Sequence, residues 1–331
     1  METKIKNIKS HRQLRQGQDS EAVASPVQRN LSGNAKGITI VLLLVSIGLC
    51  QGQTFNEKIT KEIGFESKSV SNALIVANIN GSIEITGYEG EKVLLEVTRT
   101  IKAKTASRLE QGKKEIQLGM IDRADTLIFY VAGTCNKFGK NKGEERNWGS
   151  DDGWGYNWSN CKDDRCDTPY DYTLDFNLKV PFSVNLLVST INDGNIAVTN
   201  MKGAMRVNNI NGSIKLSNIL KEASASTING NVDVEYVKNP DKACRFYTLN
   251  GDINAWFQKG LAANLSFESY NGEFYTNVDK LESLPAMVEK EQRDNSVRYK
   301  VNGNRFKIGN GGVPLEFETF NGDVYLKERA N

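Results

Sequence analysis

Histidine is almost missing from this sequence, which has one, His11, in 331 residues. Serine–histidine and cysteine–histidine catalysis and histidine metal sites all need an imidazole, which titrates near neutral pH. Because His11 lies near the start of the chain, the rest of the chain lacks all three kinds of site. Catalysis by carboxylates, lysine, arginine or tyrosine stays open. We expect no catalytic residue, no cofactor and no metal, and we predict that the protein is not an enzyme.

A strong net charge is also missing, since 42 Lys and Arg face 40 Asp and Glu. Residues 1–36 hold seven basic and three acidic residues, which leaves 35 basic and 37 acidic residues in the remainder. Proteins that bind nucleic acid present a concentrated basic surface to the phosphates. The sequence therefore predicts no nucleic-acid partner.

One uncharged apolar run, ITIVLLLVSIGL at residues 38–49, follows the basic start of the chain. It is short of the about 20 residues that a membrane-spanning helix needs. Its length, and the small residue Gly52 after it, are typical of a signal peptide cleaved before Gln53. We therefore predict a basic leader over residues 1–52 and an exported bacterial protein of the periplasm, outer surface or cell envelope.

The fate of this leader stays open. Its unusually long basic start is explained if translation begins downstream of Met1, or if residues 38–49 remain as a membrane anchor. A lipoprotein would use Cys50, although the bulky Leu49 precedes it where a small residue is normal.

Asn-Gly pairs recur along the rest of the chain, each followed by a polar residue and then a β-branched or aromatic one. From Gly194, in the variant Asn192-Asp193-Gly194, successive glycines are 18, 18, 21, 21 and 50 residues apart. Asn-Gly tolerates positive φ and is typical of tight turns. We expect structural turns at Asn80-Gly81, Asn211-Gly212, Asn229-Gly230, Asn250-Gly251, Asn271-Gly272 and Asn321-Gly322.

Hydrophobic residues keep fixed distances from each turn glycine, at seven, five and two residues before it and at two and four after it. This alternation predicts strands with one face in a core. A small polar residue three before the glycine suits a hydrogen bond to the backbone at a bend. Around Gly251 the hydrophobic residues are Cys244, Phe246, Leu249, Ile253 and Ala255, and the polar one is Thr248.

The nearly constant repeat length favours an all-β fold, a short β-solenoid or β-helix-like stack of Asn-Gly-turn coils with a loop-rich insertion. A meander of independent hairpins is the alternative. Residues 53–331 would form a single β-repeat domain, interrupted by the insertion 133–168. Residues 105–117 and 281–294 are predicted to be helical, and residues 170–181 a long strand.

The sequence resembles the bacterial putative adhesin domain family, an Asn-Gly β-repeat domain of unknown function. The resemblance rests on residues 171–203, DYTLDFNLKVPFSVNLLVSTINDGNIAVTNMKG, and on residues 305–326, RFKIGNGGVPLEFETFNGDVYL. It implies a solenoid-like fold in an exported or surface-associated protein and supplies no catalytic motif. The insertion departs from the family pattern.

The insertion is rich in Gly, Asn and charge, so it cannot form a core of its own. In an exported protein, a disulfide is expected among its cysteines, with Cys135–Cys161 and Cys135–Cys166 both open. Cys244 lies at a core position and is expected to be a buried thiol.

The insertion also concentrates tryptophan, with Trp148, Trp154 and Trp158 beside several aspartates. These rings could stack on the sugars of a cell-surface glycan, or they could fold the loop back onto the wall of the repeats. A calcium site at the aspartates is a weaker alternative, because no calcium-binding loop motif is present.

Asp252 and Asp323 recur directly after a turn glycine, as the acids of a β-helical carbohydrate-active enzyme might. Other repeats carry Ser82, Asn231 or Glu273 at this position, which indicates a structural role. We therefore favour a non-enzymatic adhesin or interaction scaffold, with a glycan or envelope protein as partner. The alternatives are that enzyme and a membrane-anchored envelope structural or sensor protein.

Overall fold

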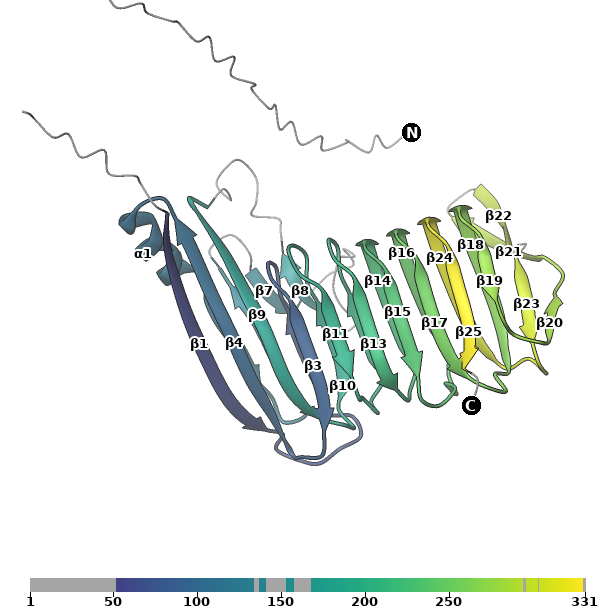
Figure 1. Ribbon diagram of the computed structural model, residues 1–331, viewed down its shortest axis with the longest axis horizontal. Helices are drawn as coiled ribbons and strands as arrows, with labels where there is room; N and C mark the ends of the chain where they lie inside the picture. The colour runs from purple at the N-terminus through teal and green to yellow at the C-terminus, as the bar shows by residue number, and fades with distance from the viewer. Residues whose placement is uncertain are drawn as a thin grey trace, which may run out of the picture. The chain divides into compact units, whose positions relative to one another are not determined.

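Most of the described residues lie in β-strands. The computed structural model in Figure 1 describes residues 52–133, 137–140, 153–157, 168–293, 296–302 and 304–329, all within the unit Cys50–Asn331. The apolar run 38–49 lies outside these residues. One short helix, α1 (Ala106–Glu115), begins after its N-cap Thr105 and contacts β1, β4 and β9. The predicted all-β class and the predicted helix near residues 105–117 are confirmed.

The strands form two large sheets and two hairpins. The ten-stranded sheet has the spatial order β1 (Gln53–Gly64), β4 (Lys92–Ala103), β9 (Tyr170–Pro181), β3 (Ile83–Tyr88), β11 (Ile196–Thr199), β13 (Ile214–Ile219), β15 (Val232–Tyr236), β17 (Ile253–Gln258), β25 (Val324–Arg329), β19 (Phe274–Thr276). The eleven-stranded sheet has the order β20 (Leu281–Ser283), β23 (Arg305–Ile308), β18 (Ala263–Asn271), β24 (Val313–Asn321), β16 (Cys244–Asn250), β14 (Ala223–Asn229), β12 (Met205–Asn208), β10 (Asn185–Ser189), β2 (Ala73–Ala77), β6 (Thr126–Ala132), β5 (Gln117–Asp122). The hairpins are β7 (Lys137–Lys140) with β8 (Trp154–Asn157), and β21 (Met287–Arg293) with β22 (Ser296–Asn302).

The two arms of an Asn-Gly turn lie in different sheets and do not pair with each other. β12 pairs in parallel with β14 of the next repeat, and β13 pairs in parallel with β15. A hairpin meander would instead pair β12 with β13 in antiparallel fashion. Antiparallel pairs occur near the ends of the sheets, as in β1–β4, β5–β6 and β18–β23, so both sheets are mixed.

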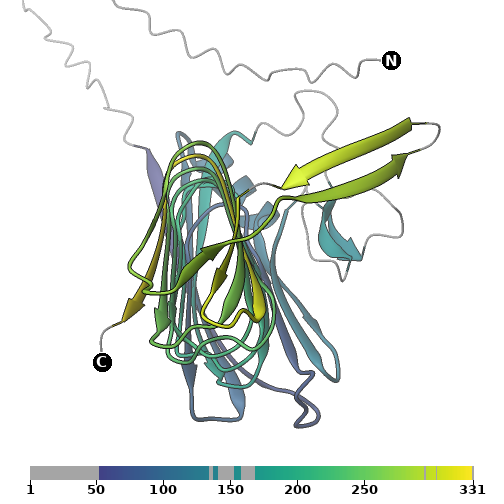
Figure 2. The same ribbon diagram turned by 90° about the vertical axis from the view of Figure 1, so that its right-hand side faces the viewer.

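The two sheets face each other and share one hydrophobic core. Figure 2 is a view along the direction in which the repeats stack, and it shows the two sheets as two layers. The core residues are those that the spacing predicts at seven and five before the glycine and at two and four after it. Around Gly251, Cys244, Phe246, Ile253 and Ala255 are all buried.

The position two before the turn glycine differs from the prediction in all of these repeats except the first, where Ile79 is 5% exposed and buried as predicted. Because strand side chains alternate with period two, positions seven, five and three before the glycine share the core face, and position two lies on the outer face. Leu249 is accordingly half-buried, and Tyr270 and Phe320 are 76% and 44% exposed.

Four of the small polar residues three before the glycine, Asn209, Thr227, Thr248 and Thr319, bond to the carbonyl of a turn glycine in the neighbouring repeat, whereas the buried Ser269 hydroxyl has no such partner. The Oγ1 atoms of Thr227 and Thr248 donate to Gly212 O and Gly230 O, each at 2.8 Å. Both threonines are fully buried. This supports the predicted hydrogen bond to the backbone at the bend.

Replacing Thr248 with valine, which has the same shape, is expected to lower the free energy of unfolding by about 1 to 3 kcal/mol. The change removes the buried hydroxyl and leaves the Gly230 carbonyl without this donor. Urea denaturation measures the loss. Thr248→Ser keeps the hydroxyl and serves as the control; equal losses in both variants would contradict the role of the hydrogen bond.

The turn asparagines form a continuous ladder of side-chain hydrogen bonds across the repeats. Each Nδ2 donates to the Oδ1 of the neighbouring asparagine at 2.8–3.2 Å. All donors point the same way, so each bond polarises the next. In stacking order the ladder contains Asn80, Asn192, Asn211, Asn229, Asn250, Asn321 and Asn271.

The spatial order of the repeats departs from chain order at both ends. β24 lies between β16 and β18, and β25 lies between β17 and β19, so the last repeat of the chain is inserted between two earlier ones. At the other end β9 lies between β4 and β3. The insertion 133–168 joins β6 to β9, where other repeats have an Asn-Gly turn.

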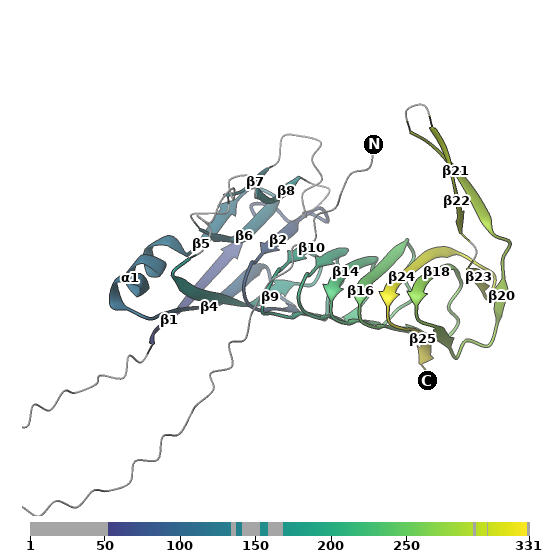
Figure 3. The same ribbon diagram turned by 90° about the horizontal axis from the view of Figure 1, so that it is seen from above.

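The helix expected over residues 281–294 is wrong. This segment contains β20 and β21, and β21 pairs with β22 across a short connection. The charged residues of β21 suggested a helix, but the alternating Val297, Tyr299 and Val301 on the paired strand favour strand structure. Figure 3 shows β21 and β22 projecting from the β20–β23 end of the sheets.

Candidate functional site

The described part of the insertion is a hairpin, β7–β8, held on the outside of the eleven-stranded sheet. Tyr156 of β8 is 4% exposed, and its hydroxyl donates to Ala77 O at 2.8 Å and accepts from Val131 N at 2.9 Å. Burial raises the pKa of Tyr156. The Tyr156 side chain therefore anchors the hairpin to β2 and β6.

Trp154, one of the predicted ligand-binding residues, belongs to a row of rings on this hairpin. Phe138 stacks on Tyr130, with centroids 4.5 Å apart, and on Trp154, at 5.9 Å. The Arg123 guanidinium lies 4.9 Å from the centre of the Trp154 ring. Trp154 thus contacts Phe138 of its own hairpin and Arg123 of the loop between β5 and β6.

The other predicted residues of the insertion, Trp148, Trp158, Cys135, Cys161 and Cys166, lie outside the described residues. Cys244 is a free thiol and is buried in the core, as expected. Its Sγ lies 3.1 Å from the Tyr236 hydroxyl, and burial raises the pKa of the thiol. A raised pKa keeps Cys244 protonated and unreactive.

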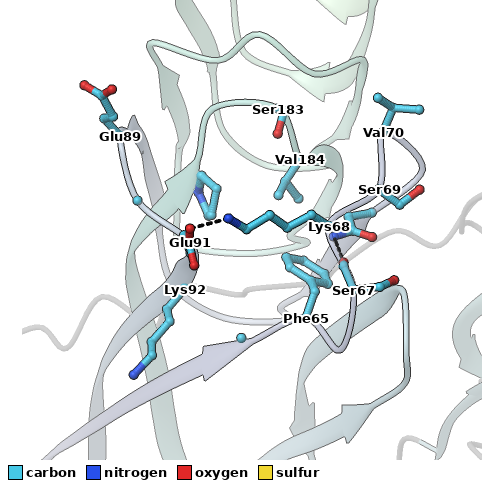
Figure 4. A pocket seen from close by; sticks show the side chains of 14 residues that line it. Phe65, Ser67, Lys68, Ser69, Val70, Glu89, Glu91, Lys92, Ser183 and Val184 are labelled. Carbon is cyan, nitrogen blue, oxygen red and sulfur yellow. Dashed lines mark hydrogen bonds and ion pairs between the residues drawn. The ribbon is translucent and has the colours of Figure 1, made fainter.

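A groove of about 750 Å³ lies where the loops after β1, β3 and β9 meet. Figure 4 shows Lys68 reaching across it to Glu91, with the Phe65 ring on one side and Val184 on the other. Val70 at the rim is 84% exposed. The groove therefore combines apolar side chains with one exposed ion pair.

One ion pair, Lys68–Glu91, forms within this groove, and Lys92 pairs with Glu62 outside it. The hydrogen bond from Lys68 lowers the pKa of Glu91, so the carboxylate stays ionised. Asn72, which also lines the groove, donates to Ser67 O at 2.8 Å. No arrangement of nucleophile and base is found among the lining residues, and the described ranges hold no cluster of three or more potential metal ligands.

Asp252 and Asp323, the candidate catalytic acids, form hydrogen bonds between neighbouring repeats. Asp252 Oδ1 accepts from the backbone N–H of Asp323, and Asp323 Oδ1 accepts from that of Glu273, each at 2.9 Å. Asn231 Oδ1 accepts from Asp252 N at 3.0 Å in the same way. These carboxylates therefore join neighbouring repeats.

A set of aromatic rings that the sequence interpretation missed lies on the outside of the ten-stranded sheet, on the adjacent strands β17, β25 and β19 (Figure 1). We call Trp256, Tyr325 and Tyr275 the outer aromatic face. The rings of Tyr275 and Tyr325 stack with centroids 5.0 Å apart and planes 10° apart. Lys327 Nζ lies 5.3 Å from the Tyr325 ring and 5.9 Å from the Trp256 ring.

Carboxylates hold the tyrosine hydroxyls of this face. Tyr275 donates to Glu273 Oε2 at 2.8 Å, and Tyr325 donates to Asp323 Oδ2 at 3.1 Å. The hydrogen bond to Glu273 and the charge of Glu273 raise the pKa of Tyr275 to about 12. The hydrogen bond to Asp323 raises the pKa of Tyr325. The signal in the sequence was an aromatic residue three after the glycine, where earlier repeats carry Asn254 or Asp233.

Replacing Glu273 with glutamine is expected to lower the pKa of Tyr275 from about 12 towards its ordinary value of about 10. The folded pKa is raised above the unfolded one, so the contact stabilises the fold below about pH 10 and is lost as the pH rises through about 12. NMR titration of the tyrosine ring carbons measures both values. Tyr88, whose hydroxyl donates to Lys92 O, is the internal control; an unchanged Tyr275 would contradict the assignment.

Within the residues that the structure describes, no helix has the length and apolar character needed to cross a bilayer.

Several solved structures are similar to this chain. A putative cell adhesion protein from Clostridium sporogenes is 11% identical, with a TM-score of 0.38 over 83% of this chain and 100% of its own. A putative adhesin from Bacteroides fragilis is 13% identical, with a TM-score of 0.31 over 82% and 97%. A putative lipid binding protein from Parabacteroides distasonis is 12% identical, with a TM-score of 0.25 over 82% and 97%. Similarities this low assign no function.

The sequence matches no protein-family model and none of the curated proteins.

Proposed function

We propose that this chain is an exported, non-enzymatic interaction scaffold of the bacterial adhesin type, built as a short β-solenoid. One coil of the solenoid is a strand of the eleven-stranded sheet, an Asn-Gly corner and the next strand of the ten-stranded sheet. Coils such as β12–β13 and β14–β15 stack in parallel and in register, which supports the solenoid.

The observation that carries the proposal is that the polar groups at the corners bond to neighbouring coils. Thr248 bonds to the Gly230 carbonyl, Asn250 bonds to Asn229, and Asp252 accepts from the backbone of Asp323. The stack is thus held by its own corners, and the outward side chains of the strands can vary without disturbing it. A rigid wall with a variable outer surface suits binding.

Export rests on the leader, residues 1–52, with its apolar run 38–49. The insertion 133–168 is a second contact region, because its hairpin is fixed by Tyr156 and carries Trp154. With Trp148 and Trp158 it would contact a glycan or an envelope protein. A disulfide among Cys135, Cys161 and Cys166 would tie this loop.

A β-helical carbohydrate-active enzyme is the alternative that Asp252 and Asp323 raise. A catalytic acid needs a carboxyl group that can reach substrate and exchange protons. Both aspartates instead accept backbone hydrogen bonds from the neighbouring coil. The alternative is therefore disfavoured.

Cell fractionation tests the proposal. The full-length chain, produced in a bacterial host and detected by antibody, is expected in the envelope or periplasm. N-terminal sequencing should show Gln53 first if the leader is cleaved, and an intact leader in the membrane fraction if it is retained. Purely cytoplasmic protein with its leader intact would overturn export.

A depolymerisation screen with a panel of polysaccharides tests the absence of catalysis. No new reducing ends are expected with the purified protein. Turnover that is lost in Asp252→Asn or Asp323→Asn would overturn the non-enzymatic proposal.

A further inference from the structure

At two outward-facing positions of the repeat, the residue type changes to aromatic in the two repeats β24–β25 and β18–β19. Three residues after the turn glycine, the earlier repeats carry Glu, Ala, Lys, Asp or Asn, and these two carry Tyr325 and Tyr275. Two residues before the glycine, the earlier Asn-Gly repeats carry Ile or Leu, and these two carry Phe320 and Tyr270. Aromatic rings are therefore concentrated on the outside of one end of the stack.

Core packing does not account for these rings. Tyr275 of the outer aromatic face is 44% exposed. On the other sheet, Tyr270 of β18 and Phe320 of β24 are 76% and 44% exposed, and their rings stack with centroids 4.9 Å apart. A lone exposed ring is ordinary, but a cluster of exposed rings marks a contact surface. The neighbouring strands β15 and β17 pair in the same register with Asp233 and Asn254 in place of the tyrosines.

The outer aromatic face has the chemistry of a sugar site. The nearly parallel rings of Tyr275 and Tyr325 offer flat apolar surface, and Trp256 lies on the next strand, β17. The carboxylates of Glu273 and Asp323 lie beside the ring hydroxyls. A pyranose presents a flat C–H face, which packs on an aromatic ring, and a rim of hydroxyls, which donate to carboxylates.

The rings are also held in place before any ligand arrives. Each tyrosine hydroxyl donates to the carboxylate of the residue directly before its own strand, and Tyr325 is stacked against Tyr275. A site that is already ordered loses little conformational entropy on binding. A sugar, which offers few strong contacts, benefits most from this order.

The charge of the site selects among glycans. Asp252, Asp323 and Glu273 lie along this edge of the sheet, and Lys327 is the basic side chain over the rings. The acidic excess disfavours sugars that carry carboxylates or sulfates and favours neutral or amino sugars.

We propose that the outer aromatic face, Trp256, Tyr325 and Tyr275, is a carbohydrate-binding site for neutral or amino-sugar glycans. The inference rests on the proposed function, because an extracellular glycan reaches only an exported chain. It places the contact on the end of the stack and apart from the insertion.

The test uses a variant that copies residues the fold already accepts. Tyr275→Asn with Tyr325→Asn places in both repeats the residue that β17 carries at the same position, Asn254. The full-length protein is applied to an array of neutral, amino-sugar and acidic glycans, and binding to the best glycan is measured by calorimetry. We expect a loss of affinity of at least about tenfold.

Two controls separate binding from folding. Tyr275→Phe with Tyr325→Phe keeps both rings and should retain most of the affinity. Tyr270→Leu removes an exposed ring outside the site and copies Leu249 of the β16–β17 repeat, so it should bind as the wild type does. In the wild type, the bound oligosaccharide should shift the ring signals of Tyr275 and Tyr325 in NMR spectra and leave Tyr88 unchanged, whatever the stability of the variants.

Four results would overturn the inference: no glycan bound by the wild type, equal binding by the double asparagine variant, a preference for acidic glycans, or unshifted Tyr275 and Tyr325 signals. None of these four results bears on export or on the absence of catalysis. The fractionation and depolymerisation experiments test those two parts of the proposed function. If Trp154→Ala with Trp158→Ala abolishes binding and the tyrosine variant does not, the glycan site lies in the insertion and the scaffold proposal stands.

Discussion

Replacing Gly251 with alanine is expected to lower the free energy of unfolding by at least about 3 kcal/mol. Gly251 has φ +153°, and an added Cβ would lie 2.2 Å from the carbonyl oxygen of Gly230 and 2.6 Å from its carbonyl carbon. Both atoms belong to the backbone of the neighbouring repeat. They can move only if the two repeats separate, which breaks the ladder between Asn229 and Asn250.

Thermal and urea denaturation measure this loss. Gly139→Ala in β7 is the matched control, because an added Cβ there meets nothing within 4 Å. It should change stability by less than about 1 kcal/mol. A Gly251 variant as stable as the Gly139 variant would show that the repeats do not approach each other this closely.

Ending the chain at Gly312 is expected to abolish cooperative folding of the C-terminal half. The effect should be larger than the loss of two strands from the edges of the sheets, because β24 and β25 lie inside them. The deletion removes β24 and β25, each of which pairs with a strand on both sides. It also removes Phe317 and Leu326 from the core, both of them buried. Each buried aromatic or leucine side chain contributes about 2 to 5 kcal/mol.

Hydrogen exchange and limited proteolysis check this expectation, with β16 to β19 becoming unprotected in the shortened chain. The control replaces the hairpin β21–β22 by a short linker, because that hairpin forms its own sheet. This variant should keep the protection of both large sheets. Protection of β18 and β19 without β24 and β25 would show that the inserted repeat is dispensable.

The core residues of the repeats could be predicted from the sequence because their spacing follows the alternation of side chains along a strand. Alternation puts Phe246 and Ile253 on the same face of their strands, and a hydroxyl at Thr248 suits a bend. The same rule places Leu249, Tyr270 and Phe320 on the outer face, because each lies three residues after a buried phenylalanine of its own strand: Phe246, Phe267 or Phe317. Their apolar character alone favours burial, and the alternation of the strand overrides it.

The spatial order of the repeats could not be predicted from the sequence. An Asn-Gly pair indicates where the chain turns, but it does not indicate which repeat packs next to that turn. The long step from Gly272 to Gly322 is compatible with stacking at either side of β18–β19. The choice depends on long-range pairing, such as Cys244 with Leu315, that no local pattern contains.

The outer aromatic face was partly readable. Tyr275 and Tyr325 occupy a position where no earlier repeat carries an aromatic residue, so their aromatic character is visible in the sequence as an exception. The carboxylates that hold their hydroxyls were also visible, two residues earlier in each case. The stacking of the two rings on adjacent strands depends on the inserted repeat and required the structure.

Under the proposed export, the inserted repeat also sets the order in which the strands can assemble. A chain that crosses a membrane from its N-terminus delivers β18 and β19 before β24 and β25, so the earlier strands arrive with no neighbour to pair with. They must wait, apart from β16 and β17, until residues 313–329 emerge and enter the space between them. The C-terminal strands β24 and β25 therefore complete the two sheets. A chain that ends before them would leave β16 to β19 without their pairing partners and accessible to proteases.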